Sequence, residues 1–408
     1  MEWLFNFVFF YPLLMSFVWI AGACIFIIFR MDRQKKPPKI EGNPLVSILI
    51  PCHNEEASIN ETINAAMQQE YPNYEVIAIN DASTDRTAVL LTILQQQYPR
   101  LRVVTLATNQ GKAVGLTMAA IASRGEYLVC IDADALLDPQ ALPWLLSHFA
   151  GPRVGAVTGN PRVRNRTTII AKIQVAEFSS IIGMIKRAQR VIGKVFTVSG
   201  VVVAFRKRAL LDVGFWSNNM VTEDIDISWK LQLAKWDIRY EPRALCWILM
   251  PEMLRGLWRQ RLRWAQGGIE VLLKYGKDMF RWHNRRIWPI YTEYVLSLCW
   301  CYSFLVTLLL WLAGFFINLP QSIIVRTMIP GWTGIIIATV CLVQLTVGIG
   351  IDRRYDKHLS KLSIWLLWYP AIYWVINCFV TIAAFPKALF KNRQKSAVWT
   401  SPDRGFGR

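Results

Sequence analysis

The sequence is poor in charge and lacks the patterns that build several common sites. Charged residues make up 18% of its 408 positions, whereas a soluble enzyme carries roughly 25%. Its 8 cysteines form no CxxC pair and its 4 histidines are scattered, so no disulfide scaffold or zinc site is expected. No Walker A sequence is present and no GxGxxG follows a strand-like run, which disfavours a P-loop or dinucleotide-binding enzyme.

Acidic residues are outnumbered by basic ones, and apolar residues are abundant. Lys and Arg total 46 against 28 Asp and Glu, a net charge of +18. Such an excess suggests a membrane surface, an anionic substrate or nucleic acid as partner. Hydrophobic residues make up 53% of the chain, which excludes intrinsic disorder. Because these residues lie in long blocks, we expect a membrane partner and no nucleic acid.

Four long stretches of the chain contain no charged residue. They are Trp3–Phe29, Tyr294–Val325, Thr327–Ile351 and Leu362–Pro386. Each exceeds the ~20 residues that span a bilayer as a helix. Buried core helices are the alternative, but four uncharged stretches of this length favour a multi-pass membrane protein.

The charges that flank these stretches predict an orientation. The first stretch is too long for a signal peptide, and its basic residues follow it, at Arg30, Arg33, Lys35, Lys36 and Lys39. The positive-inside rule therefore places the next segment in the cytoplasm. Counting crossings then puts the C-terminus outside, whereas Lys387, Lys391, Arg393 and Lys395 favour the inside. A re-entrant last segment, broken at Pro370, would reconcile the two.

Residues 44–243 have the pattern of a cytoplasmic α/β domain. Strand-like runs occur at Val46–Ile50, Tyr74–Asn80, Leu101–Leu106 and Tyr127–Asp132. Between them lie helix-compatible segments at Glu55–Gln69, Thr84–Gln97 and Lys112–Ala122. Alternation of this kind, with continuous apolar strands, predicts a mostly parallel sheet.

Polar residues follow three of the predicted strands, where open sheets of this kind bind ligands. They are Pro51–Glu55, Asn80–Ser83 and Asp132–Asp134. Two carboxylates at Asp132 and Asp134, after a buried strand, suit a hard cation such as Mg²⁺ or Mn²⁺ that also binds substrate phosphates. A pair of solvated turn aspartates is the alternative interpretation.

A second acidic cluster, Thr222–Asp226, precedes a short amphipathic segment. Thr and Asp cap helix N-termini well, which is the structural interpretation. The functional one is a carboxylate that takes a proton from an alcohol. Both hold if Asp226 or Thr222 caps the helix and Asp224 acts as the base.

A third cluster lies on a predicted amphipathic helix. Its apolar stripe consists of Leu254, Leu257, Trp258, Leu262, Ala265, Ile269, Leu272 and Leu273. Gln260, Arg263 and Trp264 share another face. We expect this helix in the membrane interface with its apolar side in lipid, and a second interfacial stretch at Ile169–Ile185. A plain basic anchor would explain the charges but not the Gln and Trp.

Taken in order, these motifs resemble those of the processive membrane glycosyltransferases of family 2, which include cellulose, chitin and hyaluronan synthases. The motifs are Pro51–Glu55, Asn80–Asp85, Asp132–Asp134, Thr222–Asp224 and Gln260–Trp264. Longer stretches are similar to the branch of this family that makes poly-β-1,6-N-acetyl-D-glucosamine in bacteria. They are Phe196–Phe205, Val221–Leu233, Glu241–Glu252, Gln260–Gly268 and Val398–Gly405.

This resemblance implies a GT-A type nucleotide-sugar-binding domain and a set of residue roles. Residues on the donor side, expected to bind UDP-N-acetylglucosamine, are Glu55 and Asp81 at the uridine, Asp132 and Glu223 at the nucleotide, Lys112 at the phosphates, and Asp134 at Mg²⁺ (or Mn²⁺). Residues on the reaction and acceptor side are Asp224 as base, Arg263 as diphosphate clamp, Trp264 as sugar platform with Gln260 of the same motif, and Ser199 and Gly200 along the acceptor site.

The resemblance also implies a function and an order of domains. The chain is expected to polymerise N-acetylglucosamine into β-1,6-linked exopolysaccharide of the biofilm matrix and pass it across the bacterial inner membrane. A small membrane subunit, with cyclic di-GMP at the interface, is the implied partner. The expected segments are a membrane helix and linker (1–43), the catalytic domain (44–243), interfacial helices (244–288), further membrane helices (289–386) and a basic tail (387–408).

Three alternatives stay open at this point. The chain could make another polymer of the hyaluronan, chitin or cellulose kind, or transfer a single sugar to a lipid. A non-catalytic nucleotide-sugar sensor or transporter would not require both a base at Asp224 and the carboxylate pair at Asp132 and Asp134. Analysis of the product made from UDP sugars separates polymer, glycolipid and no product.

Overall fold

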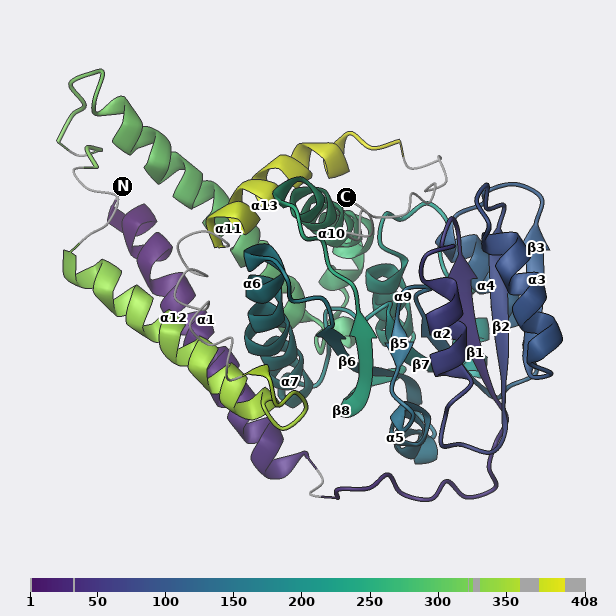
Figure 1. Cartoon of the computed structure of the whole chain (residues 1–408). Coiled ribbons are helices and arrows are strands. Elements are labelled where there is room, and N and C mark those ends of the chain that lie inside the picture. Colours follow the sequence, from purple (N-terminus) through teal and green to yellow (C-terminus); the bar gives the residue numbers. More distant parts are fainter. Residues whose placement is uncertain (1, 32–33, 322, 326–330, 360–373, 393–408) are drawn as a thin grey trace.

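The computed structural model describes residues 2–31, 34–321, 323–325, 331–359 and 374–392. An α/β domain lies at one end of the molecule and a group of long helices at the other (Figure 1). Between them lie α6 (Ile169–Glu177), α7 (Gly183–Ile192) and α10 (Leu254–Tyr275).

In the described part of the chain, eight strands form one sheet in the order β3-β2-β1-β4-β7-β6-β8-β5. Their bounds are β1 Val46–Cys52, β2 Tyr74–Asp81, β3 Leu101–Leu106, β4 Tyr127–Ile131, β5 Leu136–Leu137, β6 Val154–Val163, β7 Val202–Arg206 and β8 Asp237–Ile248. Strands β1 to β4 are mutually parallel, as are β6 and β8. Strand β7 runs antiparallel to β4 and β6, and β5 runs antiparallel to β8. The predicted α/β fold with a mostly parallel sheet is confirmed.

The register of the sheet gathers the polar strand ends at one edge. Strands β1, β2 and β4 are buried along their whole length, which explains their mainly apolar sequence. Val46 of β1 pairs with both Tyr74 and Tyr127, so the carboxyl ends of these three strands lie together. Strand β7 runs the opposite way, and Val202 pairs with Ile131. The residues before β7 therefore reach the same edge as those after β4.

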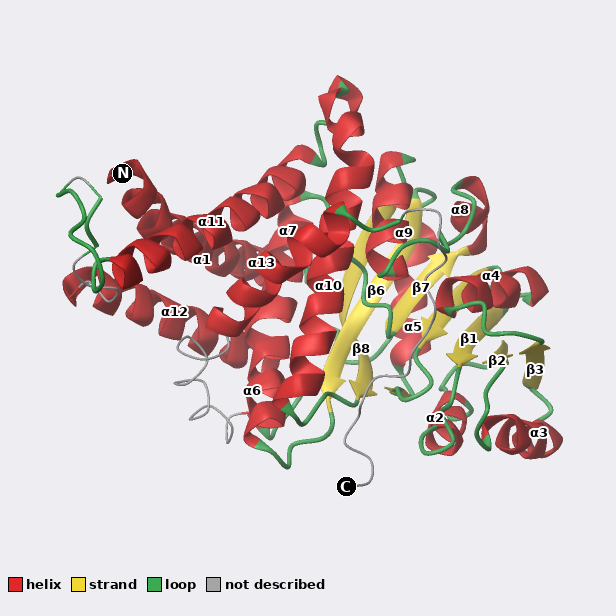
Figure 2. Ribbon diagram, turned by 90° about the horizontal axis from the view of Figure 1, so that it is seen from above, coloured by secondary structure: helices red, strands yellow, loops and turns green. Residues whose placement is uncertain are grey.

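Helices cover both faces of this sheet (Figure 2). The helices α2 (Ile59–Ala66), α3 (Thr87–Gln97) and α5 (Ala141–Leu146), the last followed by the 3-10 turn η1 (Ser147–Ala150), contribute to the core on one face. The core on the other face includes α4 (Lys112–Ala122), α8 (Lys207–Asp212) and α9 (Glu223–Leu233). This three-layer arrangement buries the apolar strands from both sides.

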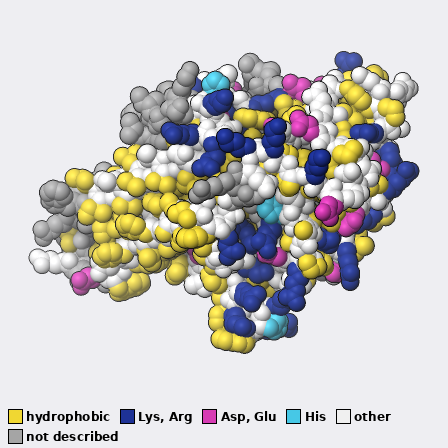
Figure 3. Space-filling view, turned by 90° about the horizontal axis from the view of Figure 1, so that it is seen from below, with side chains coloured by type: hydrophobic (Ala, Val, Ile, Leu, Met, Phe, Trp, Pro, Cys, Tyr) yellow, Lys and Arg dark blue, Asp and Glu magenta, His cyan; other side chains and the backbone are white. Residues whose placement is uncertain are grey.

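Within the described residues, three helices are long and apolar enough to cross a membrane. They are α1 (Glu2–Phe29), α11 (Trp288–Ala313) and α12 (Gly331–Asp352), and they correspond to the first three predicted membrane stretches. The fourth stretch appears as α13 (Trp374–Leu389), while its beginning, Pro370 included, lies outside the described residues. Apolar side chains gather over this end of the molecule, and Lys and Arg over the rest (Figure 3).

The predicted interfacial stretch at Ile169–Ile185 is instead part of a helix inside the protein. Helix α6, the π-helical turn η2 (Phe178–Ile182) and α7 follow one another without a break. Ile173 belongs to the core of the α/β domain, whereas Ala188 packs against Trp19 of α1. A Cβ atom on Gly22 of α1 would lie 2.5 Å from the Cβ of Ala188. This close approach brings the α/β domain against the membrane-length helices.

The apolar stripe predicted on residues 254–273 also differs from expectation. Leu257, Ile269 and Leu272 are buried, and α10 packs along α9 and α13. The prediction that this stripe faces lipid is therefore wrong for these three side chains. Beyond α10, the 3-10 turns η3 (Gly276–Phe280) and η4 (Trp282–Asn284) lead into α11.

The ends of α12 and α13 are both held against the α/β domain. The buried carboxylate of Asp352, the last residue of α12, forms ion pairs of 2.8 Å with Arg162 of β6 and 2.6 Å with Arg187 of α7. Lys391, just after α13, lies 2.9 Å from Oε2 of Glu270 on α10 and 2.7 Å from the backbone oxygen of Asn219. These contacts place Lys391 on the same side as the α/β domain, which differs from the outside position that counting crossings predicts for the chain after the last stretch.

Candidate active site

One cavity of about 1030 Å³ joins the polar edge of the sheet to the long helices. Ten of the twelve predicted site residues line it: Lys112, Asp132, Asp134, Ser199, Gly200, Glu223, Asp224, Gln260, Arg263 and Trp264. They come from α4, the ends of β4 and β7, α9 and α10. The structure therefore gathers into one site residues that are spread over 150 positions of sequence.

Lys112 is the centre of the charged end of this cavity. It is the first residue of α4, and its Nζ atom lies 2.7 Å from Oδ1 of Asp132 and 2.9 Å from Oε1 of Glu223. These carboxylates hold the pKa of Lys112 above its ordinary value, against the effect of burial. Lys112 in turn holds the pKa of Glu223 below its ordinary range. Motifs from β4, α4 and α9 thus form one ionised cluster.

The two remaining predicted residues, Glu55 and Asp81, are buried beside the cavity. The carboxylate of Asp81 accepts hydrogen bonds of 2.8 Å from the backbone N–H groups of Gln110 and Gly111. Gly111 has φ 86° and precedes α4, so Asp81 holds the turn that presents Lys112. Contact of either carboxylate with a uridine stays a prediction.

Asp224 has the environment of a general base. Its Oδ2 atom lies 3.3 Å from the backbone nitrogen of Gly200, which donates to it, and its Oδ1 accepts from the N–H of Ile225 at 2.9 Å. Burial, reinforced by the negative charge of Glu223, raises the pKa of Asp224 to about 6. A base with this pKa is ionised near neutral pH and still able to hold a proton. A Cβ on Gly200 would lie 3.2 Å from Oδ2 of Asp224, so glycine permits this contact.

Neither Thr222 nor Asp226 caps helix α9 with its side chain, although the sequence predicts that one of them does. Thr222 occupies the N-cap position of α9, but its side chain makes no capping hydrogen bond. Asp226 is buried within the helix and lies 2.6 Å from Nζ of Lys274 and 2.8 Å from the hydroxyl of Tyr275. Asp226 therefore joins α9 to α10 and is not a cap.

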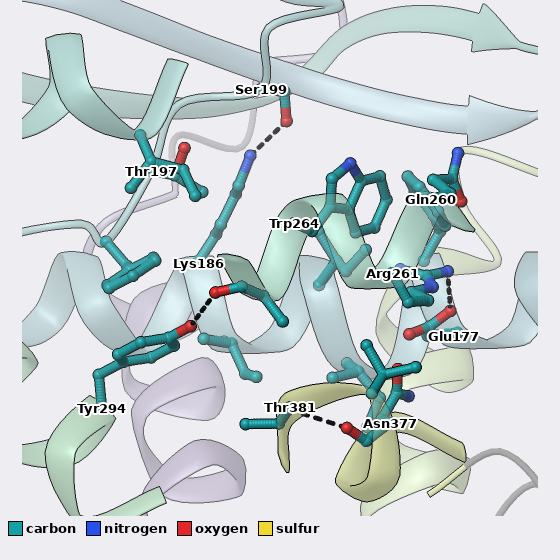
Figure 4. Close-up of a pocket in the computed structure, with 18 of the residues that line it drawn as sticks. Glu177, Lys186, Thr197, Ser199, Gln260, Arg261, Trp264, Tyr294, Asn377 and Thr381 are labelled. Atoms are coloured by element: carbon teal, nitrogen blue, oxygen red, sulfur yellow. Dashed lines mark hydrogen bonds and ion pairs between the residues drawn. The ribbon is translucent and has the colours of Figure 1, made fainter. Parts of the chain in front are cut away.

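The predicted sugar platform, Trp264, is fixed by side chains that the sequence did not identify. The guanidinium carbon of Arg261 lies 4.3 Å from the Trp264 ring centroid, and Arg261 forms a buried 2.6 Å ion pair with Glu177 at the end of α6. Phe178 meets the indole edge to face at 6.5 Å. Arg261 lies within the recognised motif, but its partner is 84 positions away, which no local pattern indicates (Figure 4).

The cavity continues from Trp264 between the long helices. Polar side chains on this part of the wall are Tyr11 and Ser16 of α1, Tyr294 of α11, Gln344 of α12, and Asn377 and Thr381 of α13. In Figure 4, Tyr294, Asn377 and Thr381 lie below Trp264, whereas Lys186 lies beside it and Ser199 above. Sequence reasoning missed the polar residues on the four long helices, because isolated polar positions within uncharged stretches show no pattern.

The carboxylates at the charged end of the cavity could bind a divalent cation only together with other ligands. The described residues contain no group of three or more His, Cys, Asp or Glu that could hold a metal ion alone. Asp132 and Asp134 nevertheless both line the cavity, and Mg²⁺ is commonly held by one or two carboxylates together with substrate phosphates and water. The donor set therefore fits an ion that arrives with a phosphorylated substrate.

Fold and cavity together define a class. A sheet edge with acidic side chains, a buried carboxylate beside it and a cavity that leads among apolar helices are the features expected of a membrane-associated glycosyltransferase. A family model described as glycosyltransferase like family 2 matches residues 43–267. This chain belongs to glycosyltransferase family 2, as the motifs predicted.

Individual relatives extend this assignment over the whole chain. A poly-beta-1,6-N-acetyl-D-glucosamine synthase of Staphylococcus epidermidis is 40% identical over 417 residues, covering 98% of each chain. The protein of the same name from Staphylococcus aureus (strain COL) is 40% identical over 409 residues, again covering 98% of each. Among solved structures, a mannosyltransferase of Pyrobaculum calidifontis in complex with GDP-Man and Mn²⁺ matches with a TM-score of 0.62 and 19% identity, over 94% of this chain and 99% of that one. The last similarity concerns the fold.

Proposed function

We propose that this chain polymerises N-acetylglucosamine from UDP-N-acetylglucosamine into a β-1,6-linked exopolysaccharide of a biofilm matrix. The staphylococcal synthases, similar over 98% of this chain, support the choice of sugar and linkage. The observation that carries the proposal is the single cavity that contains Asp224 and Trp264 and continues to Asn377 and Thr381 of α13. A polymer can grow at one end of such a cavity and leave through the other, which transfer of one sugar to a lipid does not require.

In the proposed reaction Asp224 is the general base. It takes the proton of the acceptor 6-hydroxyl as that oxygen attacks the anomeric carbon of the donor. The bond between this carbon and the UDP oxygen breaks, so the α-linked donor yields a β-linked product. The N–H of Gly200, which donates to Oδ2 of Asp224, orients the base towards the part of the cavity that Trp264 and Ser199 line.

The donor diphosphate occupies the charged end of the cavity in this proposal. Lys112 and Arg263, both on the wall, are the cations available to the departing UDP. Asp134 would hold Mg²⁺ or Mn²⁺, which would stabilise negative charge on the diphosphate, and Asp132 would contact the nucleotide. Two residues would position these cations: Gln260 lies on the same helix as Arg263, and Glu223 is bound to Lys112. Asp81 and Glu55 would hold the uridine of the donor.

We further propose a multi-pass position in the bacterial inner membrane with the α/β domain in the cytoplasm. The apolar length of α1, α11 and α12 supports it. Contacts of Asp352 and Lys391 with the α/β domain support a last segment that enters the membrane and returns to the same side. The division into residues 1–43, 44–243, 244–288, 289–386 and 387–408 is retained as the proposed domain order.

A regulatory subunit belongs to the proposal as well. The expected partner is a small membrane protein, with cyclic di-GMP bound between it and this chain. The basic residues suggested for such an anionic ligand, Arg285, Arg286, Arg353 and Arg354, are all exposed. Anchoring to the membrane surface is the competing role for these four residues. Polymer synthesis by the purified chain alone, equal with and without the dinucleotide, would contradict the need for this partner.

Linkage analysis of the product made from labelled UDP-N-acetylglucosamine tests the function. We expect a β-1,6-linked polymer from the unchanged chain. Asp224→Asn should bind UDP equally well but lower turnover by roughly 10²–10⁴, the range for a positioned base. Asp212→Asn on α8 is the matched control and should be fully active. A glycolipid or another polymer from the unchanged chain would contradict the proposal, and so would the lack of any product when the partner subunit and cyclic di-GMP are supplied.

A further inference from the structure

Lys186 of α7 is a buried cation on the cavity wall with no role in the reaction described above. Its side chain is 5% exposed and lines the cavity. Its Nζ atom donates a hydrogen bond to Oγ of Ser199 and lies 3.5 Å from Oγ1 of Thr158 on β6. Among the described residues it has no carboxylate within ion-pair distance, unlike Lys112 in the same cavity.

A buried ammonium with only neutral partners is costly unless another group uses its charge. Burial lowers the pKa of Lys186 to about 8, and the negative charge of Asp224 opposes this shift. An ammonium has three N–H donors, and the two hydroxyl groups accept from at most two of them. At least one donor therefore remains for an atom within the cavity.

The position of Lys186 indicates which ligand reaches it. Ser199, its hydrogen-bond partner, is adjacent to Gly200, whose N–H binds the base Asp224. Lys186 extends from α7 towards Ser199 and lies on the same side of the cavity as Thr197, beside Trp264 (Figure 4). In the proposed function the diphosphate binds at the ion cluster of Lys112, Asp132 and Glu223, and Lys186 is not a member of that cluster.

Apart from Asp224, the charged groups near Lys186 are either paired with each other or exposed. On α6 and α10, Glu177 and Arg261 form an ion pair with each other. Arg263 of α10 is exposed on the cavity wall. The neighbouring helices α1 and α12 contribute uncharged polar side chains, Ser16 and Gln344. Asp224 is thus the charged group that affects the Lys186 ammonium.

We propose that Lys186 is an acceptor-binding residue, whose ammonium donates a hydrogen bond to an oxygen of the terminal sugar of the growing chain. This inference rests on the proposed polymerase function and assigns a recognition group to its acceptor side. Hydroxyl and acetamido oxygens of a sugar accept hydrogen bonds from an ammonium, so one of them would use the N–H donor that Ser199 and Thr158 leave over. The contact would place the acceptor hydroxyl next to Asp224, because Ser199 and Gly200 join the two groups.

The test is the kinetics of Lys186→Met, which keeps the unbranched side chain and removes the donor. With an N-acetylglucosamine oligosaccharide as acceptor, we expect its KM to rise about 10- to 100-fold, as for loss of a hydrogen bond from a charged group. Affinity for UDP, measured by calorimetry, should be unchanged. Lys186→Arg should recover part of the acceptor affinity.

Lys194→Met is the matched control. Lys194 lies just after α7 and is half-buried, and burial lowers its pKa to about 8 as it does that of Lys186, but it does not line the cavity. Its substitution should leave acceptor KM unchanged. UDP binding and the thermal midpoint of each variant show whether it has folded.

The pH profile adds a readout that a purely structural role would not move. Acceptor kcat/KM should fall at alkaline pH as Lys186 loses its proton near pH 8, and Lys186→Met should lack this alkaline limb. Unchanged acceptor KM in a folded Lys186→Met protein would overturn the inference, and so would an equal loss of UDP affinity, which would place Lys186 at the donor. Neither result would contradict the proposed function, as long as the unchanged chain makes the polymer.

Discussion

The ammonium nitrogen of Lys112 lies 2.9 Å from Oε1 of Glu223, so the first residue of α4 is joined to the residue that precedes the proposed base. The same ammonium lies 2.7 Å from Asp132. Its positive charge is among those that oppose the rise in the pKa of Asp224, while Glu223 promotes it. If Lys112 binds the donor and Asp224 is the base, as proposed, one lysine couples donor binding to the ionisation of the base.

This coupling predicts the effect of Lys112→Met on pH dependence. Asp224 must be ionised to act, so activity rises with pH through its pKa of about 6. Removal of the Lys112 charge raises that pKa further, and the acid limb of kcat/KM should move to higher pH. UDP affinity should fall about ten-fold or more, as for a hydrogen bond between charged groups.

Lys207→Met is the control for this experiment, because Lys207 binds the backbone oxygen of Ser123 and lies outside the cavity. It should shift neither the acid limb nor the UDP affinity. An acid limb at the same pH in Lys112→Met and the unchanged enzyme would show that Lys112 and Asp224 are not coupled.

A second prediction concerns the metal. Asp134→Ala should weaken UDP binding in Mg²⁺ and abolish the difference between Mg²⁺ and chelator, because carboxylate and diphosphate share the ion. Asp132→Ala should weaken nucleotide binding with a smaller change in metal response, since Asp132 is already paired with Lys112. Titration of UDP by calorimetry in Mg²⁺, in Mn²⁺ and in chelator measures both effects. If Asp134→Ala turns over normally, with the metal dependence of the unchanged enzyme, Asp134 is not a ligand.

The strand half of the site could be predicted because its signals are local. Val46–Ile50 and Tyr127–Ile131 are continuous apolar runs that form buried strands, and Asp132 and Asp134 follow directly. Physical rules alone then place these carboxylates at the ligand edge of a parallel sheet. The positions of Asp224 and Trp264 needed the family resemblance, since their motifs have ordinary structural interpretations.

The contacts that complete the site could not be predicted from local sequence. Arg261 pairs with Glu177, and Lys186 reaches Ser199 across the junction of α7 and the sheet. Charged residues on an amphipathic helix normally face solvent, so periodicity assigned Ile169–Ile185 and the helix that became α10 to a membrane surface. Burial of their polar groups depends on how the helices pack, which a pattern of single residues does not specify. Asp226 was misinterpreted for the same reason, because its partners lie on α10.

A third prediction tests the packing that holds the base in place. A Cβ atom on Gly267 of α10 would lie 1.8 Å from Oγ1 and 2.7 Å from Cβ of Thr222, the N-cap residue of α9. Gly267→Ala must therefore displace the start of α9, at a cost of about 1–3 kcal/mol for overpacking, and should lower both the thermal midpoint and polymer synthesis.

Adding Thr222→Gly to Gly267→Ala should restore much of the thermal midpoint and of polymer synthesis, because the threonine side chain makes no capping hydrogen bond. Gly350→Ala serves as the control, since its added Cβ meets nothing within 4 Å. A Gly267→Ala protein with unchanged thermal midpoint and activity would contradict the close packing of α10 on α9.

The last prediction concerns the side of the membrane on which the chain after α13 lies. Lys391 contacts Glu270 and Asn219 of the α/β side, so the adjacent Phe390, which is 83% exposed, should lie in the cytoplasm. Phe316, just beyond α11 and 86% exposed, should lie outside. In a variant without the native cysteines, a membrane-impermeant maleimide should label Phe316→Cys in intact cells and Phe390→Cys only after permeabilisation.

Arg208→Cys, on the exposed surface of α8, is the cytoplasmic control and should behave as Phe390→Cys does. Labelling of Phe390→Cys in intact cells, with Arg208→Cys still protected, would mean that the last segment crosses the membrane. The contact between Lys391 and Glu270 could not then form, and the order of crossings counted from the uncharged stretches would be correct.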